Sequence, residues 1–385
     1  MTSLTIVRSL LDALIGFDTT SRLSNLELID WIEAQLLPLG AACVRISNDT
    51  GDKANLWARL GPDIPGGLVL SGHTDVVPVD GQDWSTDPFE LTEKDGRLYG
   101  RGTSDMKSFI ALCLAFAPEI ASRDLKKPIH FAFSYDEEVG CQGAPAMIDR
   151  IIESGCQPDA VWVGEPTLWQ VVSGHKGIVV SEVEVFGHEA HSSLPHLGVS
   201  AISEAVSLMR VLGDIAAELA ARKIDGSAFY PPHPTLTIGQ VSGGTAANIL
   251  ARHCRFVFDL RCPPGFDPDE ILAPFVDAVA LANADLSQRF PDCGVKLTRI
   301  TNAPSLAIDR ASPAETLLRA LTGDNATRAV AYATEAGQFH AAGIPAIVCG
   351  PGSIDQAHIP NEWIATDELS RGVDIFSDLL THLAT

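Results

Sequence analysis

The sequence predicts an α/β protein that contains a larger domain with a mostly parallel sheet and an inserted, ferredoxin-like domain. Two observations indicate this fold class. Short, almost wholly apolar runs separated by helical stretches lie in the first and last parts of the chain, whereas strands of alternating polarity lie in its middle. In addition, 385 residues exceed the roughly 100 to 200 residues of one typical domain. Two domains are therefore expected.

The predicted strands of the larger domain are apolar on both faces. They are residues 68–72, 129–135, 160–164 and 346–350. Such runs are typical of strands that are covered by helices on both sides. A helical stretch at 106–120 lies between two of them, and another at 367–384 closes the chain. This alternation predicts a largely parallel central sheet.

The middle of the chain predicts a sheet with one face in water, because 178–186 and 254–260 partly alternate apolar and polar residues. The expected order is strand 178–186, helix 198–221, strand 234–241, strand 253–261, helix 267–283 and strand 295–300. This β-α-β-β-α-β order is ferredoxin-like. The predicted domains are 1–177 and 301–385 for the larger one, and 178–300 for the insertion.

Charge and composition exclude several classes of protein. Lys and Arg total 27 against 49 Asp and Glu, a net charge of −22, which disfavours a nucleic-acid partner. No run approaches the roughly 20 apolar residues of a membrane span, so we expect no membrane association and a cytoplasmic protein. Eight cysteines without a C-x-x-C pair indicate buried, reduced thiols.

Residue types that bind metals follow each apolar run of the larger domain. The carboxyl ends of parallel strands meet at one edge of a sheet, so these side chains are expected to converge. Another acid, just before the helix at 106–120, is placed to join them. The candidates are His73, Asp105, Asp136, Glu137, Glu138, Glu165 and His358.

Two histidines and three carboxylates without sulfur suit a pair of divalent ions such as zinc, with cobalt or manganese tolerated. One carboxylate can bridge two ions, and such a pair is equipped for hydrolysis. Neighbouring side chains in an extended strand point oppositely, so if Glu138 binds an ion, Glu137 is free to act as the general base. Asp75, two residues after His73, is placed to orient a metal-bound imidazole.

Each candidate also has a structural explanation. His73 alone is more often a hydrogen-bonded histidine than a ligand, and Asp105 could cap the following helix. Glu137 and Glu138 could form a solvated turn, and Glu165 could be a loop acid. Five such coincidences at one edge of one domain are harder to accept than a single site.

The chain resembles the zinc-dependent family of acetylornithine deacetylases, succinyl-diaminopimelate desuccinylases, aminoacylases and glutamate carboxypeptidases. The resemblance extends from about residue 18 to 363. It is carried by SGHTDVVP, LYGRGTSDMK, SYDEEVGCQGA, VGEPT, GHEAHSSLPHLGVSA and GPGSIDQAHIPNEW.

The resemblance implies a role for each candidate. One ion would be held by His73 and Glu165, and the other by Glu138 and His358, with Asp105 bridging them. Glu137 would be the general base, and Asp75 would be the carboxylate that orients the metal-bound imidazole of His73.

The resemblance also makes the larger domain catalytic and the insertion a lid through which a homodimer forms. His191 would help to stabilise the oxyanion, often in the neighbouring subunit's site. His188 is a rival for this role. The alternative is that His191 is an ordinary histidine of a surface loop. Asn248 and Arg261 fall where family members contact the substrate's carboxylate or carbonyl, although Arg261 could equally form a structural salt bridge in the lid.

The implied reaction is hydrolysis of a small N-acyl amino acid. FDTTSRLSNLELI, YPPHPTLTIGQVSGGTAANI and GPGSIDQAHIPNEW most resemble the acetylornithine deacetylase branch, which implies N2-acetyl-L-ornithine as substrate and acetate and ornithine as products, in arginine biosynthesis. The segment 334–343 departs from that branch after TEA. The alternatives are another deacylase or desuccinylase, a dipeptidase or carboxypeptidase, and an inactive binding protein of the same fold. Neither a G-x-G-x-x-G motif nor a phosphate loop supports a nucleotide-binding dehydrogenase.

Overall fold

The computed structural model describes residues 2–383, which form two compact units. The first unit comprises the chain up to Gly174, Leu306–Ala329 and the chain from Thr334 onward. The second comprises His175–Ser305 together with Val330–Ala333. Segments 175–177, 301–305 and 330–333, which the sequence analysis expected in the larger domain, thus belong to the second unit.

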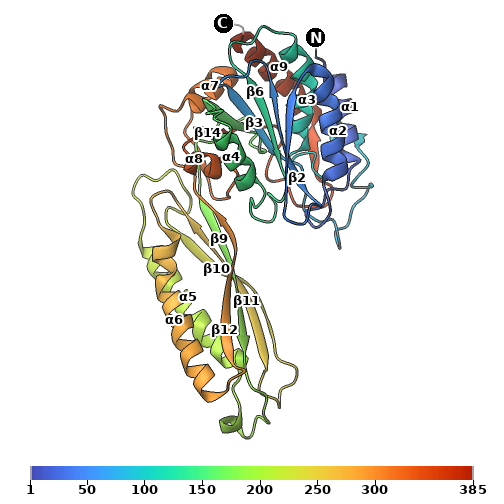
Figure 1. Cartoon of the computed structure of the whole chain (residues 1–385). Helices are drawn as coiled ribbons and strands as arrows, with labels where there is room; N and C mark the ends of the chain where they lie inside the picture. The colour runs from blue at the N-terminus through green and yellow to red at the C-terminus, as the bar shows by residue number, and fades with distance from the viewer. Residues whose placement is uncertain (1, 384–385) are drawn as a thin grey trace. The chain divides into compact units, whose positions relative to one another are not determined.

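The first unit is built on a six-stranded sheet with the order β1-β2-β6-β3-β7-β14 (Figure 1). The four strands from β6 to β14 are mutually parallel, and β2 runs antiparallel to both its neighbours. The parallel strands coincide with the four apolar runs of the sequence, which confirms the predicted fold class. The bounds are β1 Ala42–Ser47, β2 Ala54–Leu60, β3 Leu68–His73, β6 Ile129–Ser134, β7 Ala160–Val163 and β14 Ala346–Val348.

Helices cover both faces of this sheet, which explains why its parallel strands carry few polar residues (Figure 1). Helix α3 (Lys107–Ala121) is buried along nearly all its length and packs with α1 (Leu4–Ile15), α2 (Leu26–Leu36) and α9 (Thr366–Leu383). Helices α4 (Ala144–Glu153) and α8 (Ala336–Ala341) contact each other and the sheet, and α7 (Pro313–Thr322) packs on β7 and β14.

A small three-stranded sheet lies beside the main one in the same unit. Its order is β15-β5-β4, with β4 at Thr92–Lys94, β5 at Arg97–Tyr99 and β15 at Trp363–Ala365. Strands β5 and β15 are antiparallel, with Tyr99 opposite Trp363. This pairing brings the loop after β5 next to the loop before β15, although more than 250 residues separate them in sequence.

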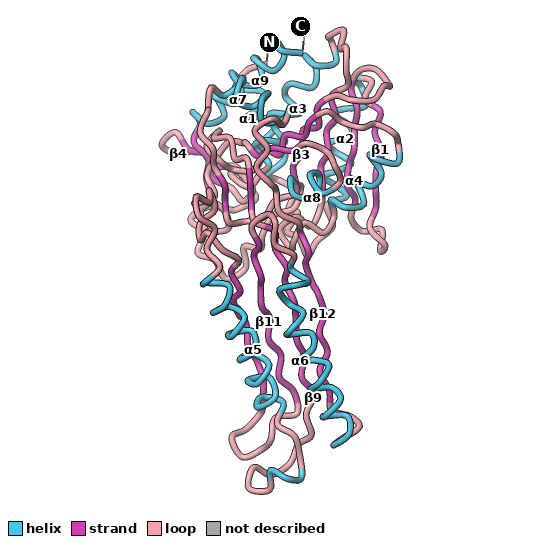
Figure 2. Tube along the Cα trace, turned by 90° about the vertical axis from the view of Figure 1, so that its left-hand side faces the viewer, coloured by secondary structure: helices cyan, strands magenta, loops and turns pink. Residues whose placement is uncertain are grey.

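The second unit has the element order β9-α5-β10-β11-α6-β12, the β-α-β-β-α-β order of a ferredoxin-like unit. Its four strands are antiparallel in the order β10-β11-β9-β12, and both helices pack on one face (Figure 2). Strands β9 and β11 alternate buried and more exposed residues, as expected for one wet face. The bounds are β9 Gly177–Phe186, α5 Ala201–Ala221, β10 Thr235–Gly243, β11 His253–Cys262, α6 Pro268–Arg289 and β12 Gly294–Ala303.

Two expectations from composition concern the whole chain. Among residues 2–383, no helix is both long and apolar enough to cross a membrane. All eight cysteines are free, and seven of them are buried. The cytoplasmic location stays a prediction.

Candidate metal centre

The predicted ligands lie at the carboxyl ends of three parallel strands and in two loops. His73 is the last residue of β3, Glu138 follows β6, and Glu165 follows β7. Asp105 comes from the loop before α3, and His358 from the loop between β14 and β15. The parallel order of β6, β3 and β7 therefore places three ligand-bearing segments at one sheet edge.

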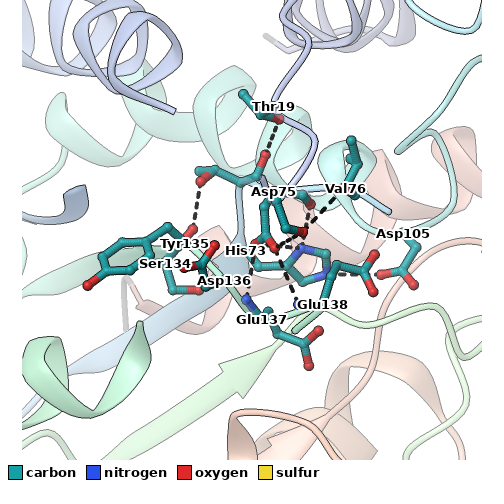
Figure 3. Close-up of polar contacts among 12 residues, drawn as sticks. Thr19, His73, Asp75, Val76, Asp105, Ser134, Tyr135, Asp136, Glu137 and Glu138 are labelled. Atoms are coloured by element: carbon teal, nitrogen blue, oxygen red, sulfur yellow. Dashed lines mark hydrogen bonds and ion pairs between the residues drawn. The ribbon is translucent and has the colours of Figure 1, made fainter. Parts of the chain in front are cut away.

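The structure brings the five predicted ligands together around Asp105. One Asp105 oxygen, Oδ1, lies 3.0 Å from His73 Nε2, and the other, Oδ2, lies 3.3 Å from His358 Nε2. Figure 3 shows Asp105 beside the ring of His73. His358 Nε2 is also 2.9 Å from Glu138 Oε2, and His73 Nε2 is 4.0 Å from Glu165 Oε1. Each oxygen of Asp105 thus faces a different histidine, the arrangement needed for a bridging carboxylate.

The charges of the cluster fit divalent cations. Burial, together with the charge of Asp105, raises the pKa of Glu138 to about 7 and also raises the pKa of Glu165 well above its ordinary value. Oxygen Oε1 of Glu165 is buried and accepts no hydrogen bond from any residue of 2–383. An orphaned carboxylate oxygen among crowded acids is what a bound cation would satisfy, and the oxygen and nitrogen donors suit zinc or cobalt.

Glu137 lies against this cluster without occupying the same position as Glu138. One oxygen of Glu137, one of Glu165 and a ring nitrogen of His73 all lie within 4.8 Å of one another. Burial and the negative charge of Glu138 raise the pKa of Glu137 to about 8, against the opposing charge of His73. A carboxyl that holds a proton near neutral pH is suited to transfer protons.

Asp75 differs in detail from its expected role. Nitrogen Nδ1 of His73 lies 2.8 Å from the backbone oxygen of Asp75, whereas the Asp75 carboxylate is 3.7 Å away. The carboxylate instead accepts the backbone N–H groups of Glu137 (3.1 Å) and Glu138 (3.3 Å) and the hydroxyl of Ser21 (2.7 Å), as is partly visible in Figure 3. Asp75 therefore orients His73 through its main chain and holds the Glu137–Glu138 turn through its side chain.

The structural alternatives for two acids can now be compared with the geometry. Helix α3 has Met106 at its N-cap position, and no side chain caps it, so Asp105 does not serve as the cap. The third acid of the triplet, Asp136, forms an ion pair of 2.5 Å with Lys53. Asp136 therefore has a partner of its own outside the ligand cluster.

The lid candidates lie in the second unit. His191 is exposed, its Nδ1 lies 2.7 Å from the hydroxyl oxygen of Ser193, and its backbone forms a bridge with Ile249, beside Asn248. Arg261 is at the far end of the ten-residue strand β11, where it contacts Asp259 (3.3 Å) and the backbone oxygen of Ala331 (3.5 Å). The structure thus groups His191 with Asn248 and separates Arg261 from both.

Two buried acids close to the predicted ligands were not singled out from the sequence. Glu335, 1% exposed, accepts hydrogen bonds from Ser134 and from Ser71 (3.2 Å), on the strands that lead to Glu137 and His73. Glu362, 0% exposed, contacts the loop that carries Asp105. The only available signals were that Glu335 lies in the departing segment 334–343 and Glu362 in the motif around His358.

Comparisons with known proteins identify the family of the chain. The family model described as Peptidase family M20/M25/M40 matches residues 69–382. The chain belongs to this family. It is 35% identical over 381 residues to an acetylornithine deacetylase of Myxococcus xanthus, which covers 98% of this chain and 97% of the relative. It is 36% identical to another from Pectobacterium atrosepticum, with coverage of 86% and 84%.

Solved structures of the family share the fold. An M20 metallo-carboxypeptidase from Sulfolobus solfataricus superposes with a TM-score of 0.77 at 16% identity, with coverage of 98% of this chain and 99% of that one. A dinuclear metal-binding M20 peptidase from Bacillus subtilis gives 0.59 at 14% identity, with coverage of 99% and 98%. The chain is accordingly a metal-dependent hydrolase of the M20/M25/M40 family, as the sequence had predicted.

Proposed function

We propose that this M20 hydrolase cleaves the amide bond of a small N-acyl amino acid and that N2-acetyl-L-ornithine is its leading substrate. The observation that carries the chemistry is the position of Asp105 between His73 and His358, with Glu137 beside them. The substrate assignment is supported by the acetylornithine deacetylases that are 35% and 36% identical to the chain. The products would be ornithine and acetate.

Two divalent ions, zinc or cobalt, would complete the site. His73 and Glu165 would hold one ion, Glu138 and His358 the other, and Asp105 both. The ions would supply positive charge that lowers the pKa of water and polarises the acyl carbonyl. A structurally similar family member is described as binding two metals, which supports this stoichiometry.

Proton transfer falls to Glu137. Its carboxylate takes a proton from the attacking water and passes it to the nitrogen of the scissile amide. That nitrogen then leaves as the neutral α-amine of ornithine. The Asp75 carboxylate fixes the position of the base, because it accepts the backbone N–H of Glu137 at 3.1 Å. In this proposal the inserted domain supplies His191, which donates a hydrogen bond to the developing oxyanion.

The substrate's carboxylate needs a cationic or hydrogen-bonding partner. Arg261 can pair with a carboxylate through two hydrogen bonds, and Asn248 can donate through its amide. Since Asn248 lies beside His191 and Arg261 lies elsewhere on the unit, we propose that Asn248 acts together with His191. Arg261 lies 3.3 Å from Asp259, so the alternative for this residue is a structural salt bridge instead of a contact with substrate.

We also propose a homodimer formed through the inserted domain. Strand β10 is an edge strand of its sheet, and most of its second half is exposed, with Val241 57% exposed. Val206 on the adjacent helix α5 is 54% exposed. An exposed edge strand next to apolar side chains is suited to pair with a second copy. Light scattering after size-exclusion chromatography tests this directly.

The test of the activity is amine release from a panel of N-acyl amino acids, N-succinyl amino acids and dipeptides by the purified protein. The panel is run before chelation, after chelation, and after zinc or cobalt is restored. Chelator-sensitive release led by N2-acetyl-L-ornithine supports the proposal. Release led by a dipeptide would favour the peptidase alternative that the metallo-carboxypeptidase fold suggests, and no metal-dependent release from any compound would favour a binding protein.

A further inference from the structure

A buried acid outside the predicted ligand set connects the two loops that carry Asp105 and His358. Glu362 is 0% exposed and directly precedes β15. The pairing of β15 with β5 places it beside the loop that follows β5, and its backbone oxygen accepts the N–H of Gly100 at 3.0 Å. The small sheet thus fixes the position from which the Glu362 side chain enters the 101–105 loop.

The 101–105 loop wraps around the Glu362 carboxylate. Oxygen Oε1 accepts the backbone N–H of Ser104 at 2.7 Å and that of Asp105 at 3.0 Å. Oxygen Oε2 accepts the backbone N–H of Gly102 at 3.0 Å and pairs with Arg101 Nη1 at 2.8 Å. Four donors on five consecutive residues leave the loop little freedom, and the last of them is the main chain of Asp105 itself.

The guanidinium of Arg101 extends this network to His358. Arg101 Nη2 donates to Gln82 Oε1 at 2.6 Å, and Gln82 Nε2 donates to the backbone oxygen of His358 at 2.9 Å. His358 has a φ of +64°, a left-handed conformation that costs a non-glycine residue about 1 kcal/mol or more. The hydrogen bond from Gln82 helps to hold this histidine in the orientation that faces Asp105 and Glu138.

We propose that Glu362 and Arg101 are positioning residues for the metal site. Glu362 fixes the bridging Asp105 through its main chain, and Arg101 fixes His358 through Gln82. The inference rests on the proposed two-metal site. Asp105 and His358, two of the residues that would hold the second ion together with Glu138, are then both positioned by the Glu362–Arg101 pair. A change in that pair should therefore alter metal affinity. Residues that support metal ligands in this way typically contribute about 10- to 100-fold in affinity.

The test is metal binding by three variants rather than turnover. Glu362→Gln keeps the shape of the side chain but removes the charge that four donors require. Gln82→Ala removes the link between Arg101 and His358, together with one hydrogen bond from Trp84, and leaves the four donors to Glu362 in place. Because Gln82 is partly exposed, this variant should fold. The matched control is Glu315→Gln, since Glu315 is also a buried acid, 1% exposed, that pairs with an arginine, Arg319, at 2.6 Å in the same unit but contacts no ligand.

Cobalt and zinc are titrated into the chelator-stripped proteins by calorimetry, and thermal unfolding of the metal-free forms is recorded in parallel. We expect two sites in the unchanged protein. Gln82→Ala, which acts on His358, should weaken one of them by about 10- to 100-fold, and Glu362→Gln, which acts on the bridging Asp105, should weaken both. Glu315→Gln should lower thermal stability without changing either site.

The outcomes separate this inference from the proposed function. An unchanged protein that binds no metal would overturn both. Two intact sites in Glu362→Gln and Gln82→Ala would overturn the positioning role alone, as would an equal loss of affinity in the Glu315→Gln control. If Glu362→Gln does not fold, Glu362→Asp replaces it, because this variant keeps the charge but shortens the reach of the carboxylate to the 101–105 loop. Gln82→Ala tests the link to His358 separately.

Discussion

Protonation of His130 should destabilise the protein in mild acid. His130 lies in β6 and is 0% exposed. Its Nδ1 accepts a hydrogen bond from Trp57 Nε1 at 3.2 Å, so the ring proton must be on Nε2, which faces the backbone oxygen of Gly66 at 3.4 Å. A second ring proton, on Nδ1, would place this N–H against the N–H of Trp57 in the core, with no acceptor between them.

The size of the effect follows from the pKa. Burial lowers the pKa of His130 from 6.5 to about 4. Between these values the unfolded chain binds a proton that the folded chain does not, so this contribution to stability is complete above pH 6.5 and is lost as the pH falls toward 4. The linkage relation gives a loss of about 2 kcal/mol at pH 5 and about 3 kcal/mol below pH 4.

The assay is urea unfolding of the chelator-stripped protein and of His130→Asn, followed by circular dichroism at pH 7.5, 6 and 5. Metal-free protein is used because ligand protonation would otherwise add its own pH dependence. The stability difference between the two proteins should shrink by about 2 kcal/mol from pH 7.5 to 5. His196→Asn, at an exposed histidine, is the control and should show no such trend. A difference for His130→Asn that does not change with pH would refute the reasoning.

Three further predictions concern the site and the fold. Glu137→Ala should lose at least about 100-fold in turnover and keep its metal content, because it removes the base and no proposed ligand; near-normal turnover would remove the assignment. His358→Ala should lower metal content by about one ion per chain in elemental analysis, and an unchanged content would contradict its role. Gly67→Ala should destabilise by more than about 2 kcal/mol in urea unfolding, because φ is +91° and a Cβ would lie 2.0 Å from the Pro128 oxygen. Gly40→Ala, with a φ of +80° and nothing within 4 Å of its Cβ, should lose only about 1 kcal/mol, and equal losses would show that the contact is not responsible.

Much of the fold was predictable because burial leaves a pattern in the sequence. Strands covered on both faces are apolar throughout, and the strands of the inserted unit alternate because one face is wet. Strands β1 and β2 were not predicted. The edge strand β1 has no buried residue, so its sequence carries little of the apolar signal. Segment 330–333 clusters with the inserted unit, and four residues are too few to show any periodicity in the sequence.

The sequence by itself determined which side chains could bind metals and that they would meet, because parallel strands deliver their carboxyl ends to one edge. Only the tertiary structure decided how those side chains are held. Asp75 supports the Glu137–Glu138 turn through two hydrogen bonds, and Glu362 binds the loop of Asp105 through several. Both join segments that are far apart in the chain. The contacts of Glu362 depend on the register of β5 with β15. Such contacts produce no repeat and no characteristic residue spacing, so they cannot be recognised in the sequence.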